Sequence, residues 1–204
     1  MRMPSDETDW WPRFTLVTYS QPTGIPHGWD EELLATGAPD GLMVKAIYKL
    51  VLLEDPKAGP LVCFGSASPH QYICLNPRNK HIMDIVLSQP IETDNSIAKV
   101  VRSAWLVNTT LDQFIASARM VTARFPFDSE GAEDDYGADD DEDECSREDR
   151  LDDERTQAAA ELVEALRRID PAAVADPDSF WMTFRDDMQM GNYSAKDMLN
   201  SRHQ

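Results

Sequence analysis

The sequence contains few of the features that mark membrane proteins or secreted disulfide-bonded proteins. No stretch of its 204 residues reaches the 18 or more uninterrupted apolar residues of a membrane-spanning helix. It has three cysteines, Cys63, Cys74 and Cys145, and an odd, small number predicts reduced thiols and no disulfide framework. The first nine residues are acidic on balance and no apolar segment follows them, so we expect a cytoplasmic protein.

Motifs that carry catalysis are also missing. The sequence has no glycine-rich phosphate loop, no Gly-x-Ser-x-Gly and no His-Glu-x-x-His. Cys63 and Cys74 lie in apolar segments without a Cys-x-x-Cys pair, and zinc sites need four ligands at tighter spacings, so buried structural thiols are favoured. A small hydrolase or transferase that combines these cysteines with His81 is the remaining catalytic alternative, and no spacing supports it. We therefore predict a protein that is not an enzyme and needs no cofactor or metal.

Basic patches are absent too, and the acidic charge is concentrated in one segment. Residues 128–154 hold 16 of the 37 acidic residues but only two arginines, so the formal charge of −18 is mostly local. Self-repulsion and scarce apolar residues predict a disordered insert. A calcium loop beginning at Asp139 would place Glu144 where glycine is required, which excludes an EF-hand. Two interpretations remain: a solvated linker, which is favoured, or a mimic of nucleic-acid charge that meets a basic partner through Asp139, Asp140, Asp141 and Glu142.

The rest of the chain predicts one domain. Apolar residues make up 42% of the sequence, enough for a sizeable core. We expect a loose N-terminal arm over residues 1–12, a single domain built from 13–127 and 155–193, and a polar tail over 194–204. Short strands separated by turns between residues 42 and 107 predict an antiparallel meander. Helical spacing resumes at Thr156 and ends at Asp170-Pro171, and Asp176-Pro177 has the form of another helix start.

The clearest local pattern runs from Leu106 to Phe125. An apolar segment stops at Asn108, Thr109 and Thr110, and helically spaced apolar residues begin at Leu111. Thr110 and Gln113 have the spacing of a capping box, in which the threonine hydroxyl accepts the amide proton of the third helical residue. We predict a strand that leads directly into an amphipathic helix, with Asn108, Thr109 and Thr110 as its structural cap.

Aromatic residues divide into two groups. Trp105, Phe180, Trp181 and Phe184 lie in strand or helix patterns and are expected in the core. Trp10, Trp11 and Trp29 lie in irregular N-terminal segments, where tryptophan is a candidate for an exposed contact with a partner protein.

Four stretches, in this order, resemble the fourth group of the SUKH superfamily of immunity proteins. Leu106-Val-Asn-Thr-Thr-Leu-Asp-Gln-Phe-Ile is similar to its hydrophobic-Asn-Ser-Ser-Leu-x-x-Phe signature, and Leu33-Leu-Ala-Thr-Gly-Ala-Pro39 to its Leu-x-x-x-Gly-Leu-Pro. Gly65 to Val86 is similar to a glycine-then-hairpin segment. Asp170-Pro-Ala-Ala-Val followed by Asp178-Ser-Phe-Trp181 resembles its C-terminal stretch. Ala38 replaces a usual leucine, Asn79 replaces a usual turn glycine, and the acidic insert is additional.

The resemblance implies an α+β domain, an antiparallel meander sheet flanked by helices, here with the disordered acidic insert. It implies a bacterial immunity protein that binds and neutralises a cognate toxin of a polymorphic or contact-dependent system, by stoichiometric binding without catalysis. The acidic charge favours a cationic, nuclease-like toxin, with no direct binding to nucleic acid or membrane. The alternative is a regulatory or scaffolding module of the same fold with another cellular partner.

Overall fold

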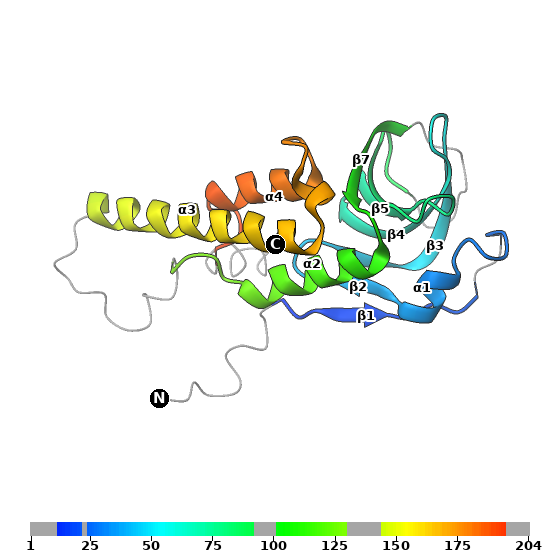
Figure 1. Ribbon diagram of the computed structural model, residues 1–204, viewed down its shortest axis with the longest axis horizontal. Helices are drawn as coiled ribbons and strands as arrows, with labels where there is room; N and C mark the ends of the chain where they lie inside the picture. The colour runs from blue at the N-terminus through cyan, green and yellow to red at the C-terminus, as the bar shows by residue number, and fades with distance from the viewer. Residues whose placement is uncertain (1–11, 22–23, 92–100, 130–143, 195–204) are drawn as a thin grey trace.

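The computed structural model describes residues 12–21, 24–91, 101–129 and 144–194, which form an α+β structure (Figure 1). A five-stranded antiparallel sheet, a two-stranded sheet and a group of helices make up the fold, as the resemblance implies. The elements in chain order are β1 (Thr15–Val17), α1 (Glu31–Thr36), β2 (Ala38–Asp40), β3 (Lys45–Asp55), β4 (Gly59–Ser68), β5 (Gln71–Leu75), β6 (Ile82–Leu87), β7 (Val101–Asn108), α2 (Leu111–Arg124), α3 (Glu144–Ile169), the 3-10 helix η1 (Pro171–Val174) and α4 (Phe180–Gln189). No helix among these residues is long and apolar enough to cross a membrane.

The large sheet has the order β3-β4-β5-β6-β7, and each strand pairs antiparallel with its neighbour in sequence. The predicted meander is therefore confirmed. The turn between β5 and β6 shows how short polar side chains make such connections. The Asn76 side chain accepts the Arg78 N–H at 3.0 Å, and the Asn79 side chain accepts the His81 N–H at 3.0 Å. Lys80, with φ 64°, takes the left-handed conformation that a glycine usually supplies.

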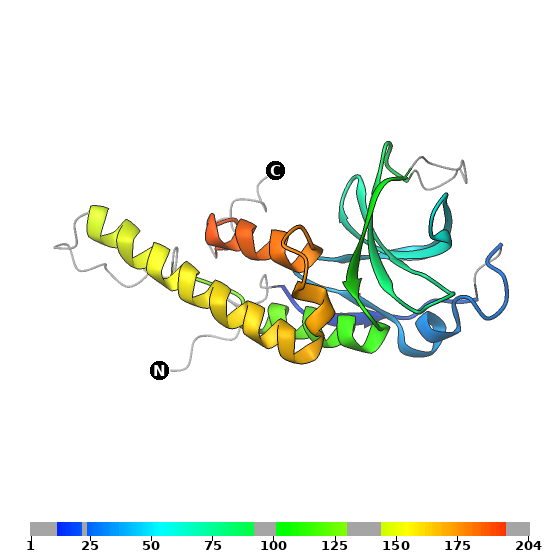
Figure 2. The same cartoon turned by 45° about the horizontal axis from the view of Figure 1, so that its top comes forward.

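Both faces of the sheet are buried, but in different ways. One face carries a cluster of strand side chains that pack on one another where the sheet curls (Figures 1 and 2): Leu53, Leu61, Cys63, Tyr72, Cys74, Ile85 and Leu87. The other face packs against the helices. There the Phe64 ring of β4 lies edge-on to Phe114 of α2, with centroids 5.9 Å apart, and Phe114 lies 6.2 Å from Trp181 of α4. This row of rings joins the sheet to two helices.

The three long helices form one layer beside the sheet, with α4 alongside α3 in both views (Figures 1 and 2). Helix α4 buries Phe180, Trp181, Phe184 and Met188 on a single face, as its spacing predicts. The helix ends at Gln189 with Met190 as its C-cap, and Gly191, the next residue, has a φ of 84°, which suits glycine.

The prediction of disorder over residues 128–154 is wrong in its described parts. Helix α3 begins at Glu144 and not near Thr156, so residues 144–154 are helical. Leu151 is 6% exposed and continues the apolar spacing of the helix toward its N-terminus, and the i,i+4 pair Arg150–Glu154, 3.0 Å apart, adds local support. Asp128 is also buried and not in a solvated linker. The many charged residues of this segment favour disorder by composition, but Leu151 and the Arg150–Glu154 ion pair support a helix there.

Candidate functional site

Asn108, at the end of β7, is the centre of a buried polar joint between the sheet and the helices. Its side chain is fully buried. The Trp181 indole N–H donates to its carbonyl oxygen at 3.0 Å, and its own amide donates to the Asp170 carboxylate at 3.2 Å. One asparagine therefore uses both ends of its side chain to connect β7 to α4 and to the start of η1.

Asp170 completes the joint. Its Oδ2 accepts the Thr109 backbone N–H at 2.6 Å and the Thr109 hydroxyl at 3.1 Å. Its Oδ1 accepts the Ala172 N–H at 3.2 Å, which caps η1. Because the carboxylate is 2% exposed and accepts several donors, its burial is compensated.

Thr110 is the N-cap of α2. Its hydroxyl accepts the Gln113 N–H at 3.2 Å and donates to the Gln113 side-chain oxygen at 2.9 Å. The Gln113 amide donates to the Ile169 carbonyl at 3.1 Å, at the end of α3. In place of the return bond of a capping box, the glutamine thus fixes α2 against α3. Asn108, Thr109 and Thr110 are all occupied by contacts within the fold.

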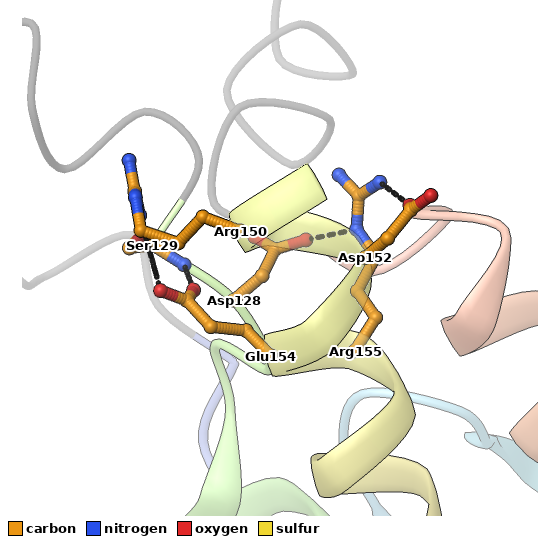
Figure 3. Close-up of polar contacts among 6 residues, drawn as sticks. All are labelled: Asp128, Ser129, Arg150, Asp152, Glu154 and Arg155. Atoms are coloured by element: carbon orange, nitrogen blue, oxygen red, sulfur yellow. Dashed lines mark hydrogen bonds and ion pairs between the residues drawn. The ribbon is translucent and has the colours of Figure 1, made fainter. Parts of the chain in front are cut away.

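A second polar cluster fixes the chain where it leaves α2 for the acidic segment (Figure 3). The Asp128 carboxylate lies 2.7 Å from Arg155 Nε, with side chains only 2% and 14% exposed. Ser129 donates its N–H to Glu154 at 2.8 Å, and Arg150 donates to Ser129 Oγ at 2.7 Å. We name these five residues the Asp128–Arg155 clasp.

The hydrogen bonds and charges within the clasp favour the ionised form of Glu154. Partial burial raises the pKa of Glu154, but the hydrogen bonds from Ser129 and Arg150 outweigh that effect, and the pKa lies below its usual value. The carboxylate is therefore ionised at neutral pH. Sequence patterns did not predict the clasp, because its contacts join residues 21 to 27 positions apart or lie within a charge-rich run.

The residues predicted as partner contacts are placed only in part. Trp10, Trp11, Asp139, Asp140, Asp141 and Glu142 lie outside the described residues. Trp29 is half-buried and packs against the main core.

Two exposed aromatic side chains were not predicted. Tyr48 is 83% exposed on β3, where the register shifts between Ala46 and Val51. Within this irregular stretch, the Tyr19 hydroxyl donates to the Phe64 carbonyl at 2.9 Å. Burial raises the pKa of Tyr19, so the hydroxyl keeps its proton and remains a donor.

The second exposed aromatic, Trp105 of β7, corrects an expectation. It was predicted in the core but is 36% exposed, because β7 is an edge strand and the helices cover only its final part.

Two of the three cysteines lie in the packed interior, and Cys145 is exposed. Cys63 and Cys74 face each other across β4 and β5, and both are fully buried. Burial, with a contribution from Cys63, raises the pKa of the Cys74 thiol, which keeps it protonated and a poor nucleophile. In the part of the chain that the structure describes, no three His, Cys, Asp or Glu side chains gather as a metal site would require.

The buried polar groups described above bond to one another and stabilise the fold. Residues 12–187 match the SUKH-4 immunity protein family, and the chain therefore belongs to that family. Membership makes it an immunity protein, and its partner class is a toxin. No curated protein and no solved structure matches the chain.

Proposed function

We propose that this protein neutralises a cognate toxin of a bacterial polymorphic or contact-dependent system by stoichiometric binding in the cytoplasm, without catalysis. The family match across residues 12–187 is the observation that carries the proposal. The joint around Asn108 supports it, because Asn108, Asp170 and Trp181 come from two of the stretches that resemble the family and meet inside the fold. The shared residues there maintain the scaffold, which leaves the surface free to vary with the toxin.

The charge of the protein favours a cationic, nuclease-like toxin. Residues 128–154 carry 16 acidic residues, and α3 exposes Asp149, Asp152 and Asp153. A concentrated negative field accelerates association with a basic partner and weakens as salt rises. We include Asp139, Asp140, Asp141 and Glu142, together with Trp10, Trp11 and Trp29, as proposed contacts.

Co-expression with the toxin encoded in the neighbouring gene tests the function. Growth should be restored, and a titration of toxin activity should reach zero at one equivalent of protein, with a 1:1 complex measured by light scattering. Failure to restore growth would refute the immunity function toward that toxin. Inactivation of excess toxin by a small fraction of one equivalent would refute stoichiometric binding.

The catalytic alternative has its own control. Replacing Cys63, Cys74 and His81 together by alanine should leave neutralisation by the folded fraction unchanged, since none of these residues belongs to a nucleophile–base arrangement in the structure. Loss of neutralisation by a variant whose circular dichroism and melting match the wild type would support an enzyme instead.

Ionic strength tests the electrostatic part separately. The toxin Kd should rise when sodium chloride is raised from about 50 to about 500 mM, because exposed charges farther apart than about 10 Å are screened at 0.1 M salt. A Kd that does not change would rule out the cationic-toxin proposal while leaving the immunity function intact.

A further inference from the structure

Strand β7 forms an open edge of the large sheet. Among the described residues it pairs only with β6, from Val101 opposite Leu87 to Asn108 opposite Ile82. The helical layer meets β7 at its end, where Asn108 bonds to Trp181, whereas Arg102, Ala104 and Trp105 are exposed. Because an antiparallel strand directs about half of its N–H and C=O groups to each side, this half of β7 has backbone groups on a side where no described strand pairs with it.

Trp105 lies within this open half. Its ring is partly exposed, and tryptophan is among the residues most enriched where protein interfaces concentrate their binding energy. Directly opposite it on β6 is Asp84, and the alternation of side chains puts both on the same face of the sheet. An aromatic surface and a carboxylate therefore occupy neighbouring positions in one row.

Asp84 is buried without full compensation. It is 3% exposed, its Oδ2 accepts the Gln71 amide at 2.7 Å, and its Oδ1 has no hydrogen-bond partner among the described residues. Burial raises its pKa to about 6, against a smaller lowering by Gln71, so the group is mainly ionised at neutral pH despite its single partner.

Three other buried aspartates have hydrogen-bond or ion-pair partners. Asp55 accepts two backbone N–H groups, Asp128 pairs with Arg155, and Asp170 accepts several donors. In contrast to these three, Asp84 keeps a buried carboxylate oxygen without a partner among the described residues, and such uncompensated groups are expected at functional positions.

We infer that an extended segment of the toxin adds to the first half of β7 as a further strand, with a basic side chain crossing the Trp105 ring toward Asp84. This inference rests on the proposed function. Unpaired strand groups are best matched by another extended backbone. Tryptophan attracts the stem and charge of arginine or lysine, and a carboxylate with an unpartnered oxygen accepts a charge-assisted hydrogen bond.

The geometry favours a long basic side chain. Neighbouring strands lie about 4.7–4.9 Å apart, so the added strand and β6 are separated by about 10 Å with β7 between them. Only a long side chain lying along the sheet over Trp105 spans that separation.

A second copy of the chain fits this edge less well than a toxin. The one basic residue of β7 is Arg102, which lies at the register shift where Ser103 pairs with Val86 and Val101 with Leu87. A second copy would offer this single cation and would also bring the same formal charge of −18, and like charge opposes self-pairing whereas a basic toxin segment is attracted.

The test uses the full-length protein and a catalytically inactivated form of the toxin encoded in the neighbouring gene. Hydrogen–deuterium exchange should show new protection of amides in residues 101–105 of the complex and none on the outer half of β3. Trp105→Ala should raise the Kd by about 30-fold or more, as expected for a central interface tryptophan. Asp84→Asn should raise it by about 10-fold, since it keeps the shape and removes the charge.

Tyr48→Ala is the matched control, because Tyr48 is the more exposed aromatic and lies on the opposite edge strand. Its Kd should stay within about twofold of the wild type. Circular dichroism and melting verify that each variant is folded, and Trp105→Phe, which keeps an aromatic ring, should recover part of the lost affinity.

Each contrary result has a distinct meaning. If the wild type binds the toxin but residues 101–105 gain no protection, or if Tyr48→Ala weakens binding more than Trp105→Ala, the β7 assignment is wrong and the immunity function stands. Protection of β7 that appears without toxin and increases with protein concentration would overturn the assignment in favour of a second copy. If the wild type neither binds nor neutralises the toxin, the proposed function fails and this inference fails with it.

Discussion

The indole N–H of Trp181 donates a hydrogen bond to the side-chain oxygen of Asn108 at 3.0 Å, across 73 positions in the sequence. Both residues are fully buried. The bond connects the last residue of β7 to the first turn of α4, and the Asn108 amide also donates a hydrogen bond to Asp170. Three elements distant in sequence are thus fixed relative to one another by a single side-chain amide.

Replacing Asn108 by alanine should lower the free energy of unfolding by at least about 2 kcal/mol, because it leaves the buried Trp181 N–H unpaired and removes a donor from Asp170. Urea unfolding followed by tryptophan fluorescence measures the change. Asn192→Ala, at an exposed position after α4, is the control and should stay within about 0.5 kcal/mol. Since Asn108 has no exposed surface, the toxin Kd of the folded fraction should be unchanged, and a weakened Kd would contradict a purely structural role.

Thr110→Ala should cost about 0.5–2 kcal/mol of stability, the usual loss when an N-cap hydroxyl is removed. The hydroxyl accepts the Gln113 N–H, and its loss also frees the glutamine that holds the end of α3. Thr156→Ala, an exposed threonine within α3, provides the comparison and should be neutral or slightly stabilising, because alanine has the higher helix propensity. Equal effects of the two substitutions would show that the cap contributes nothing specific.

Features encoded within a few residues could be predicted from the sequence. The start of α2 at Thr110 depends on a hydroxyl and an amide three positions apart. The meander depends on short strands with turn residues between them, and the inward face of α4 depends on helical spacing. The start of α4 was placed too early, because the Asp176 side chain accepts the Asp178 N–H and makes a turn, while Ser179 is the N-cap of the helix.

Features that depend on distant packing could not be predicted in the same way. Trp105 looks like a core residue within an apolar strand, and only its position at an edge of the sheet explains its exposure. The first two turns of α3 lie in a run of charge, and their stability comes from Leu151 and from the clasp with Asp128. The unpartnered oxygen of Asp84 can be identified only once the neighbouring strands are placed.

The Asp128–Arg155 pair should matter far more than an ion pair on the surface. Arg155→Met should lower stability by about 2–4 kcal/mol, because it removes the Arg155 charge from beside a nearly buried carboxylate. Arg167→Met, which breaks an exposed pair with Glu164 at 2.9 Å, is the control and should cost no more than about 1 kcal/mol. Combining Arg155→Met with Asp128→Asn should recover part of the loss, and additive losses would show that the two groups do not interact.

Asp84→Asn should make the protein more stable at neutral pH. The folded-state pKa of about 6 lies above the ordinary value of 3.8, so the folded state holds its proton more tightly than the unfolded chain. The contribution of Asp84 to the free energy of unfolding is fully present below pH 3.8 and is lost as the pH rises through about 6. At pH 7 the ionised Asp84 carboxylate lowers the free energy of unfolding by up to about 3 kcal/mol. A neutral asparagine avoids this loss, less whatever hydrogen bonding the amide itself loses.

Urea unfolding of both proteins between about pH 4.5 and pH 7 measures this effect, since contributions of other groups cancel in the difference. The stability advantage of Asp84→Asn over the wild type should shrink by about 2 kcal/mol as the pH falls across that range. Asp170→Asn is the matched control, because Asp170 is as deeply buried but accepts several donors, and its replacement should destabilise the protein. An advantage of Asp84→Asn that does not vary with pH would contradict the raised pKa. A gain in stability accompanied by weaker toxin binding would instead show that the protein retains an unfavourable carboxylate because the toxin requires it.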